Sequence, residues 1–358
     1  MKILFYISTI SYGGAGRVMS CLANQFAAAG DEVAFVTTKL EEREYTLNDA
    51  ITRYTLSDGC DNLSGLKKNI KFIQNTRKIC KEFKPDIAVS FLREPNFRLL
   101  LGSIGLNFKK VVSVRCDPPR EYTTKLWQFL AKNLYKTVDG IVFQTPDARD
   151  WFGKTVRKKS EIIFNQVDER FFNAKFSGER KNIVTAGRVD PIKNHAMLID
   201  AFSKIADKTD QNLIIYGEGR LRQPLEEQIE RLGLTDRVFM PGNTDNIVGD
   251  VGSARLFVLS SDYEGLPNAL LEALAMGVPS ISTDCPCGGP RMVMADGENG
   301  LLVPIGDADI MAEKMLWALE HPAEMEAMGN CAADRAQMFQ PDRVYKMWCD
   351  YLEKVVNK

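Results

Sequence analysis

Short apolar segments alternate with helical patterns along the whole chain. Such alternation favours parallel sheets with helices on both faces. The segments form two series, one in each half of the 358-residue sequence. In the first half we expect strands at residues 2–8, 32–37, 86–91, 110–114 and 140–143. In the second half we expect them at residues 182–186, 212–216, 237–240, 255–259 and 278–283.

The length fits two domains of about 150 to 180 residues each. A polar stretch at residues 173–181 lies between the two series of strands. We therefore expect domains at residues 1–170 and 171–340, followed by a final helix at 341–358. Six apolar residues fall near one face of that helix, which needs a surface to cover: Val344, Met347, Trp348, Tyr351, Leu352 and Val355.

The composition is that of an ordinary globular protein, with 45% hydrophobic and 26% charged residues. No run of eighteen apolar residues is present, and the first strand is too short to be a signal peptide. We expect a cytoplasmic protein. The eight cysteines lack paired C-x2-C spacing, and only His195 and His321 are available to join them at a metal. Structural thiols and no metal site are expected.

Residues 254–292 carry the strongest functional signal. A short apolar strand leads into a loop with Glu264, and a helix with Glu272 inside it follows. Pro267 suits the first turn of that helix, and Gly277 suits its left-handed end. The two glutamates can therefore face one ligand.

The loop between the glutamates presents free backbone N–H groups at a helix N-terminus, where a phosphate can bind. A carboxylate beside a bound phosphate is repelled by it, so it suits sugar hydroxyls instead. The combination predicts a nucleotide-sugar site. The loop residues expected to contribute are Gly265, Leu266 and Asn268.

The strand at residues 182–186 is followed by the sequence GRVDPIKN, which contains Arg188 and Lys193. Arginine offers a fork of donors and lysine a point charge, which together suit a pyrophosphate that gains charge as a sugar leaves. The alternative interpretation is that Arg188 and Lys193 are two exposed cations on a loop and bind no ligand. We expect His195 to begin a helix rather than to act as a catalyst.

A glycine-rich turn, SYGGAGR at residues 11–17, follows the first strand and opens a helix expected at 17–29. Its G-G-x-G spacing is not the dinucleotide-binding G-x-G-x-x-G, and no ribose-binding acid ends the second strand. A nicotinamide site is therefore not expected. A tight packing turn is one interpretation of these glycines.

The segment EGLPNALLE, followed by a Gly-Val-Pro strand and a Gly-Gly turn, resembles the donor-site signature of retaining glycosyltransferase family 4. The resemblance covers nearly the whole chain, and its specific motifs lie mostly in residues 183–303. It implies an α/β fold of the GT-B type, in which two Rossmann-like domains face each other across a cleft. It also implies that the last helix crosses back onto the N-terminal domain.

The family resemblance implies a role for each predicted site residue. Arg188 and Lys193 would hold the departing diphosphate, Glu264 would orient the donor sugar, and Glu272 would hold the ribose. The Met240 backbone would read a uracil edge. Further contacts with the donor nucleotide or its phosphates are implied for Gly14 and Gly217, besides Gly265, Leu266 and Asn268.

A nucleoside diphosphate sugar, most readily UDP-linked, is the implied co-substrate, with no other cofactor. Metal independence is expected because helix N-termini and two cations supply the charge that a divalent ion supplies elsewhere. The Asp-x-Asp at residues 307–309 opens a helical pattern, so we expect it to cap a helix rather than hold a metal.

One departure from the family concerns a histidine that many members place after the strand matching residues 111–114, where it contacts the donor sugar. This sequence has Arg115 there, followed by Asp117, and no histidine precedes His195. Arg115 either replaces the missing donor or belongs to an acceptor site with Asp117 and Arg17. A structural Arg115–Asp117 pair is the alternative.

Charge is divided unevenly along the chain. Residues 1–170 contain 27 Lys and Arg against 19 Asp and Glu, and the remainder contains 19 against 28. A helix expected at 66–84 carries much of this excess. We expect Leu66, Ile70, Ile73 and Cys80 to face inward, and Lys67, Lys68, Lys71, Lys78 and Lys81 to face outward.

A solvated helix face explains these lysines as well as a contact with anionic lipid or a lipid-diphosphate acceptor does. No RNA-binding motif is present, so no nucleic-acid partner is expected. Weak peripheral contact with the inner face of the cell membrane follows from the second interpretation.

The sequence and the resemblance together predict a glycosyltransferase that moves a hexose or N-acetylhexosamine from a UDP-sugar to a glycan or lipid-linked glycan, with retention of configuration. A non-hydrolysing nucleotide-sugar epimerase is an alternative, but it needs acid and base residues that a histidine-poor site lacks. A catalytically silent nucleotide-binding regulator is the non-enzyme alternative.

Overall fold

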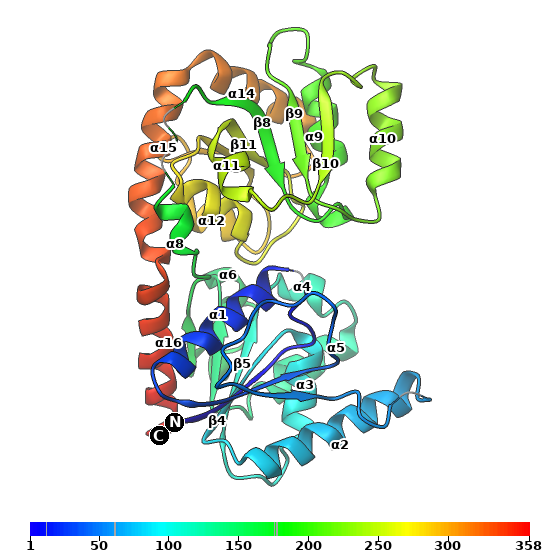
Figure 1. Cartoon of the computed structure of the whole chain (residues 1–358), viewed down its shortest axis with the longest axis vertical. Coiled ribbons are helices and arrows are strands. Elements are labelled where there is room, and N and C mark those ends of the chain that lie inside the picture. The colour runs from blue at the N-terminus through cyan, green and yellow to red at the C-terminus, as the bar shows by residue number, and fades with distance from the viewer. Residues whose placement is uncertain (12, 61, 175, 177) are drawn as a thin grey trace. The chain divides into compact units, whose positions relative to one another are not determined.

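The computed structural model describes residues 1–11, 13–60, 62–174, 176 and 178–358. The chain divides into two compact units. The N-terminal unit comprises Met1–Asn165 together with Val344–Lys358, and the C-terminal unit comprises Gln166–Arg343. Each unit is a parallel sheet with helices on both faces (Figure 1). The expected α/β architecture of two sheet-containing units is confirmed.

The sheet of the N-terminal unit has seven parallel strands in the order β3-β2-β1-β4-β5-β6-β7. The first strand ends at Tyr6 rather than Ser8, and the two outermost strands, β3 and β7, were not expected. The strands are β1 Lys2–Tyr6, β2 Glu32–Thr37, β3 Thr52–Thr55, β4 Ile87–Phe91, β5 Lys109–Val114, β6 Gly140–Phe143 and β7 Ser160–Ile162.

The helices of the N-terminal unit connect these strands. The first helix begins at Gly14 rather than Arg17, so the glycine-rich turn supplies its first residues. The helices are α1 Gly14–Ala28, α2 Gly65–Phe83, α3 Arg93–Gly102, α4 Pro118–Glu121, α5 Lys125–Leu134, α6 Pro146–Asp150 and α7 Lys154–Arg157.

The last helix, α16 (Pro341–Val356), completes the core of the N-terminal unit. Trp348 is fully buried, and its ring lies 5.7 Å from that of Phe91 on β4. The Tyr351 hydroxyl accepts a hydrogen bond from the Ile141 N–H at 2.7 Å and donates to the Lys159 carbonyl at 2.6 Å. The expected return of this helix to the N-terminal domain is therefore confirmed.

The C-terminal unit has a six-stranded parallel sheet in the order β10-β9-β8-β11-β12-β13, of which only the edge strand β13 was not expected. The strands are β8 Lys181–Ala186, β9 Leu213–Tyr216, β10 Val238–Gly242, β11 Ala254–Leu259, β12 Ser280–Thr283 and β13 Leu301–Val303. The helices are α8 Glu169–Phe172, the 3-10 turn η1 Pro191–Lys193, α9 His195–Ser203, α10 Arg222–Arg231, α11 Ile247–Gly252, α12 Asn268–Ala275, α13 Gly289–Val293, α14 Ala308–Glu320, α15 Pro322–Ala336 and the 3-10 turn η2 Gln337–Phe339.

The inward face of α2 differs from the expected one. Leu66 is 76% exposed and Ile70 47% exposed, and Ile73 is only partly buried. The residues that pack inward are Phe72, Thr76, Ile79, Cys80 and Phe83. The expectation was wrong because the first turns of α2 reach outward from the rest of the unit, so position on the helical wheel does not fix burial there (Figure 1).

In both sheets the order in which successive strands are added reverses at an equivalent point. In the N-terminal unit the chain runs outward from β1 to β3 and then returns to place β4 beside β1, and in the C-terminal unit it returns to place β11 beside β8. Open parallel sheets bind ligands beyond the carboxyl ends of the strands at this switch point. The loops after β1, β4, β8 and β11 are therefore the places where a site is expected.

Candidate functional site

The switch point of the C-terminal unit brings together the two loops that carry the predicted phosphate and sugar residues. Arg188 and Lys193 follow β8, and Glu264 follows β11. The loops are joined through main-chain and side-chain hydrogen bonds. The Asp262 N–H donates to the Ile192 carbonyl at 2.8 Å, and the Ser260 hydroxyl donates to the Lys193 carbonyl at 2.7 Å.

Lys193 and Glu264 form the closest ion pair of this region. The Lys193 Nζ lies 2.5 Å from the Glu264 Oε1, and the two side chains are only 17% and 15% exposed. The Ser261 hydroxyl donates to the same carboxylate oxygen at 2.8 Å. The Glu264 backbone is also fixed, because its N–H donates to the Pro286 carbonyl at 2.7 Å. The pair is therefore held in one position by both loops.

Arg188 is placed differently from Lys193. Its Nη2 lies 3.2 Å from Asp190 Oδ2, and its side chain is 69% exposed, so most of its donors face solvent. Arg188 borders a pocket of about 500 Å³ whose lining comes from the loops after β8, β9 and β11. The residues that line this pocket are Arg188, Asp190, Pro191, Ile192, Glu218, Gly219, Arg220 and Tyr263.

Glycines allow the loops around the pocket to pack main chain against main chain. A Cβ on Gly217 would lie 1.9 Å from the Gly187 carbonyl oxygen, and one on Gly219 would lie 2.2 Å from that of Val189. Gly217 also has a positive φ of 132°, which other residues rarely adopt. These glycines therefore build the pocket wall, and no larger residue fits without moving the β8 loop.

The second glutamate motif begins α12. Pro267 is the N-cap residue rather than part of the first turn, and Asn268 is the first helical residue. Glu272 is 6% exposed and lies one turn further along the helix. Gly289 packs against the same loop, since a Cβ there would lie 1.9 Å from the Gly265 carbonyl oxygen. The predicted end of the helix at Gly277 is confirmed by its φ of 65°.

Met240 lies on β10, the edge strand of the sheet. Its backbone carbonyl accepts a hydrogen bond from Arg222 Nη2 at 2.6 Å. Arg222 also pairs with Glu218, which borders the pocket, at 2.7 Å. The predicted base-reading position is therefore connected to the pocket wall through one arginine.

The structure bears out two predictions of structural roles. His195 is the first residue of α9 and is 3% exposed, and burial together with the nearby Lys193 lowers its pKa to about 4. His195 therefore begins the helix, as predicted, and its side chain is buried there. Asp307 caps α14, because its carboxylate accepts the N–H groups of Asp309 at 3.1 Å and Ile310 at 2.9 Å.

The glycine-rich turn lies at the switch point of the N-terminal unit. Gly14, the first residue of α1, is exposed, and the N–H of Arg17 donates to the Gly13 carbonyl at 3.2 Å. Tyr12 of the same motif lies outside the described residues. A Cβ on Gly16 would lie 3.2 Å from the Thr9 carbonyl oxygen, which supports the tight packing turn for this glycine.

Arg115 is buried at the carboxyl end of β5. Its Nη2 donates to Asn165 Oδ1, and its guanidinium lies 4.3 Å from the centre of the Phe91 ring. Burial lowers its pKa to about 9, and its Nη1 has no hydrogen-bond partner. The alternative of a structural Arg115–Asp117 pair is wrong, because Arg115 donates to Asn165 and the charges that act on Asp117 come from Arg120 and Asp147.

Asp117 instead caps the short helix α4. Its carbonyl accepts the N–H groups of Arg120 at 3.0 Å and Glu121 at 2.9 Å, and burial raises the pKa of its carboxyl. Arg115 and Asp117 are therefore both buried at one end of the sheet. They do not neutralise each other.

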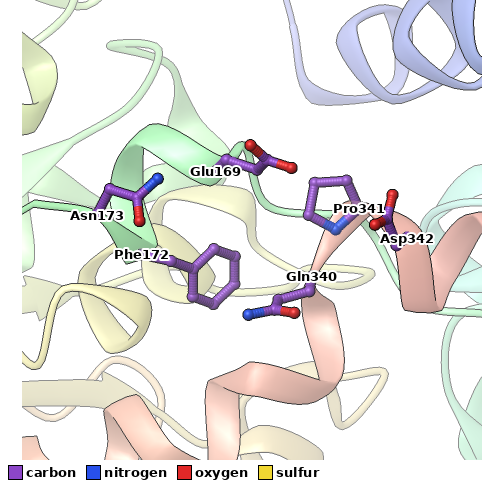
Figure 2. A pocket seen from close by; sticks show the side chains of 6 residues that line it. All are labelled: Glu169, Phe172, Asn173, Gln340, Pro341 and Asp342. Carbon is purple, nitrogen blue, oxygen red and sulfur yellow. The ribbon is translucent and has the colours of Figure 1, made fainter.

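A second hollow of about 170 Å³ lies in the C-terminal unit and contains none of the predicted site residues (Figure 2). The Phe172 ring and the Gln340 amide face each other across it, where the Val167 N–H also donates to the Phe339 carbonyl at 2.9 Å. Among the described residues, no group of three or more His, Cys, Asp or Glu side chains is arranged to hold a metal. All eight cysteines are free thiols.

Comparison with known protein families covers most of the chain. Residues 12–171 match the family described as Glycosyltransferase Family 4, and residues 166–335 match that described as Glycosyl transferases group 1. The chain belongs to glycosyltransferase family 4. It is accordingly an enzyme that transfers a sugar.

Two relatives from Campylobacter jejuni match the transferase over nearly its full length. One is a GalNAc-alpha-(1->4)-GalNAc-alpha-(1->3)-diNAcBac-PP-undecaprenol alpha-1,4-N-acetyl-D-galactosaminyltransferase, 28% identical over 100% of this chain and 99% of its own. The other is an N-acetylgalactosamine-N,N'-diacetylbacillosaminyl-diphospho-undecaprenol 4-alpha-N-acetylgalactosaminyltransferase, 27% identical over 98% of this chain and 99% of its own.

Solved structures share the GT-B fold of the transferase. Sucrose-phosphate synthase from Thermosynechococcus elongatus superposes with a TM-score of 0.85 at 19% identity and covers 99% of this chain and 98% of its own. HepE from Anabaena, solved in complex with UDP-glucose, superposes with a TM-score of 0.82 at 17% identity and covers 99% of this chain and 100% of its own.

Sequence reasoning missed several residues that shape the pocket of the transferase. Asp190 orients Arg188 and also caps η1 by accepting the Ile192 N–H at 3.1 Å. Asn194 donates to Asp262 at 2.7 Å and so ties the two loops together. Asn194 and Asp262 are 68 positions apart in the sequence, so their contact could not be read from spacing. The only sequence signal for Asn194 was its position before a helix, which is typical of a cap.

Proposed function

We propose that the enzyme transfers a hexose or N-acetylhexosamine from a UDP-sugar to a lipid-linked glycan, with retention of anomeric configuration. The observation that carries the donor assignment is the Lys193–Glu264 pair beside the pocket that Arg188 borders. It combines cations for a diphosphate with an acid for sugar hydroxyls at the switch point of one sheet. The bound UDP-glucose of HepE supports the same donor class.

In this proposal the charges of the C-terminal unit act on the departing nucleotide. Arg188 and Lys193 neutralise the charge that grows on the β-phosphate as the bond from the sugar C1 to the diphosphate oxygen breaks. Glu264 orients the sugar, and Glu272 holds the ribose. Gly217, Met240, Gly265, Leu266 and Asn268 contribute further contacts of the C-terminal unit with the nucleotide.

Retention follows if the acceptor hydroxyl attacks C1 on the face that the diphosphate leaves. The acceptor proton then passes to the departing phosphate oxygen, so no separate protein base is required. Metal independence belongs to the same proposal, because the two cations and the α12 N-terminus supply the positive charge.

The acceptor assignment rests on the relatives and on charge. Both Campylobacter jejuni relatives are named for substrates linked to undecaprenol through a diphosphate. Residues 1–170 of this chain carry the excess of Lys and Arg that an anionic lipid diphosphate requires. We propose that Gly14 of the N-terminal unit approaches the donor diphosphate and that Arg17, Arg115 and Asp117 form the acceptor side. The enzyme would then work at the inner face of the cell membrane.

No helix among the described residues is long and apolar enough to cross a bilayer.

The direct test incubates the full-length protein with UDP-N-acetylgalactosamine, UDP-N-acetylglucosamine, UDP-glucose or UDP-galactose and an undecaprenyl-diphosphate-linked N-acetylgalactosamine. Mass spectrometry of the lipid product should reveal an added sugar with one of the donors. Conversion of the UDP-sugar into its epimer without transfer would identify an epimerase. Binding of UDP without consumption of any donor would indicate a nucleotide-binding regulator.

A further inference from the structure

Two helices of the N-terminal unit turn apolar side chains toward solvent. In α5, Leu126 and Phe129 are 65% and 64% exposed and lie three residues apart, so they share one face. In α2, the exposed Leu66 and Ile70 lie four residues apart and share a face in the same way. Single exposed apolar residues are ordinary, but pairs at helical spacing form a patch that needs an explanation.

The helix α3 connects α2 and α5 into one layer. The ring of Phe97 on α3 lies 5.3 Å from that of Trp127 on α5. On its other side, Arg98 of α3 donates to Asn69 of α2 at 2.8 Å and lies 4.9 Å from the Phe72 ring. The three helices therefore pack side by side on one face of the sheet.

The exposed pairs lie at the same edge of that layer. All four apolar residues occur in the first two turns of their helices, and α2 follows β3 while α5 leads back from β5 to β6. Because the helices of a parallel sheet run opposite to its strands, their first turns lie at the carboxyl edge. The patch is therefore at the edge where this sheet is expected to bind its ligand.

Lysines border both apolar pairs. Lys67 and Lys68 are exposed beside Leu66, and Lys125 and Lys132 are exposed on α5. Helices with an apolar face bordered by lysines bind the surface of anionic bilayers, where the apolar groups enter the headgroup region. A second copy of the chain meeting this patch symmetrically would oppose lysine to lysine, which disfavours self-association.

We propose that the first turns of α2 and α5 form a membrane-docking surface for anionic lipid, into which Leu66, Ile70, Leu126 and Phe129 insert. The lysines contact lipid phosphates, and Trp127, whose ring lies 5.3 Å from that of Phe97 in a tilted arrangement, joins the first turn of α5 to α3. The surface would bring a lipid-linked acceptor to the carboxyl edge of the N-terminal sheet. Only this last consequence rests on the proposed function, because docking itself requires no substrate.

The test is co-sedimentation of the full-length protein with vesicles that contain phosphatidylglycerol, compared with vesicles of phosphatidylcholine alone. The parent should bind the anionic vesicles more strongly. The double variant Leu126→Ser, Phe129→Ser should lose roughly tenfold in partition coefficient per side chain, as expected for removing a buried large apolar group. The double variant Lys67→Glu, Lys68→Glu should lose at least about fivefold per lysine at low salt.

Salt separates the two contributions. At about 1 M salt the Debye length is ~3 Å, so the lysine contribution should vanish while the apolar contribution remains. The parent and the lysine variant should then bind equally, and the Leu126, Phe129 variant should bind least. This order distinguishes insertion of apolar groups from a purely electrostatic attraction.

Two matched controls use residues away from the patch. Lys154→Glu with Lys158→Glu changes the net charge of the same unit by the same amount, but these exposed lysines precede β7 at the amino edge of the sheet. Phe239→Ser removes a 42% exposed apolar residue from the C-terminal unit. Both controls should sediment like the parent.

Three results would overturn the docking surface. The Leu126, Phe129 variant could sediment like the parent, or the Lys154, Lys158 control could lose as much binding as the Lys67, Lys68 variant. The parent could also be a dimer that the Leu126, Phe129 variant dissociates while its vesicle binding stays unchanged. Turnover on a water-soluble acceptor should be unchanged in every variant. If vesicle binding behaves as expected but no sugar is transferred to any acceptor, the proposed function fails and the docking surface stands.

Discussion

Replacement of Glu264 by glutamine tests the central pair of the candidate site. The Lys193 Nζ lies 2.5 Å from Glu264, and less than a fifth of either side chain is exposed. The amide keeps an oxygen that can accept from Lys193 and from the Ser261 hydroxyl, but it leaves the lysine without a counter-charge. Hydrogen bonds to charged groups contribute about 1.5–3 kcal/mol. We expect unfolding of the C-terminal unit to become easier by about this amount.

The same substitution should affect transfer far more than nucleotide binding. Glu264 is proposed to contact the sugar, so Glu264→Gln should lower turnover by roughly 10²–10³, which is the effect of losing one preorganised electrostatic contact in an active site. UDP affinity should stay within a few-fold of the parent. Glu272→Ala should instead weaken UDP about ten- to a hundredfold, because its proposed contact is with the ribose.

Three measurements separate these effects. Urea denaturation gives the free energy of unfolding, calorimetric titration gives UDP affinity, and UDP release gives turnover. Glu230→Gln, an exposed acid on α10 away from the pocket, serves as the control and should change none of them. If Glu264→Gln and Glu272→Ala both bound UDP like the parent and kept full turnover, the proposed donor site would be wrong.

Three further predictions follow from other parts of the structure. Turnover should survive EDTA, and a complete loss that magnesium restores would contradict the proposed charge neutralisation by protein groups. Because burial lowers the pKa of His195 from its usual 6.5 to about 4, the unfolded chain binds more protons between these values. The free energy of unfolding should therefore fall by up to ~3 kcal/mol as the pH drops through this window. Denaturation curves of the His195→Leu variant should lack this fall, and those of the control variant His321→Gln should keep it. Arg115→Met should stabilise the N-terminal unit by about 1–4 kcal/mol, because it removes a buried cation without a counter-charge, and should impair transfer if Arg115 serves the acceptor. A stabilised variant with full turnover would make Arg115 structural only.

The central strands of both sheets and the edge strand β10 could be predicted from the sequence, but the other three edge strands could not. Apolar runs such as those of β2 and β6 are buried on both faces, which is the pattern expected for parallel sheets. The three missed strands, β3, β7 and β13, all lie at sheet edges. The first two have partly exposed side chains, and the last is only three residues long, so neither periodicity nor length marked them.

The inward face of α2 illustrates another limit. The spacing of Leu66, Ile70 and Ile73 is helical, and a helical wheel assigns them to the core. Burial also depends on whether a neighbour lies opposite each turn, and the buried side chains of α2 begin only at Phe72. Tertiary placement therefore decided which apolar residues became core, and the sequence pattern alone cannot supply it.

The composition of the candidate site was predictable, but its assembly was not. The motifs around Lys193 and Glu264 were each identified, yet the two residues lie 71 positions apart and nothing in the spacing predicts their 2.5 Å contact. The same holds for Arg115 and Asn165, which are 50 positions apart. The alternative of an Arg115–Asp117 pair did not hold, because the Arg115 guanidinium turns to Asn165 instead.

Both units repeat one topology, and their difference therefore lies in the loops at the switch points. In the C-terminal unit, the loops after β8 and β11 hold a paired lysine and glutamate with an exposed Arg188 beside them. In the N-terminal unit, the loop after β1 holds glycines at the start of α1. After β4 the chain enters α3 at Arg93, whose N–H donates to the Glu121 carboxylate at 2.9 Å. Burial raises the pKa of Glu121 to about 7, and the cationic Arg93 lies beside it. One topology thus carries two different sets of side chains at its two switch points, and in the proposed function the Lys193–Glu264 pair and Arg188 act on the donor.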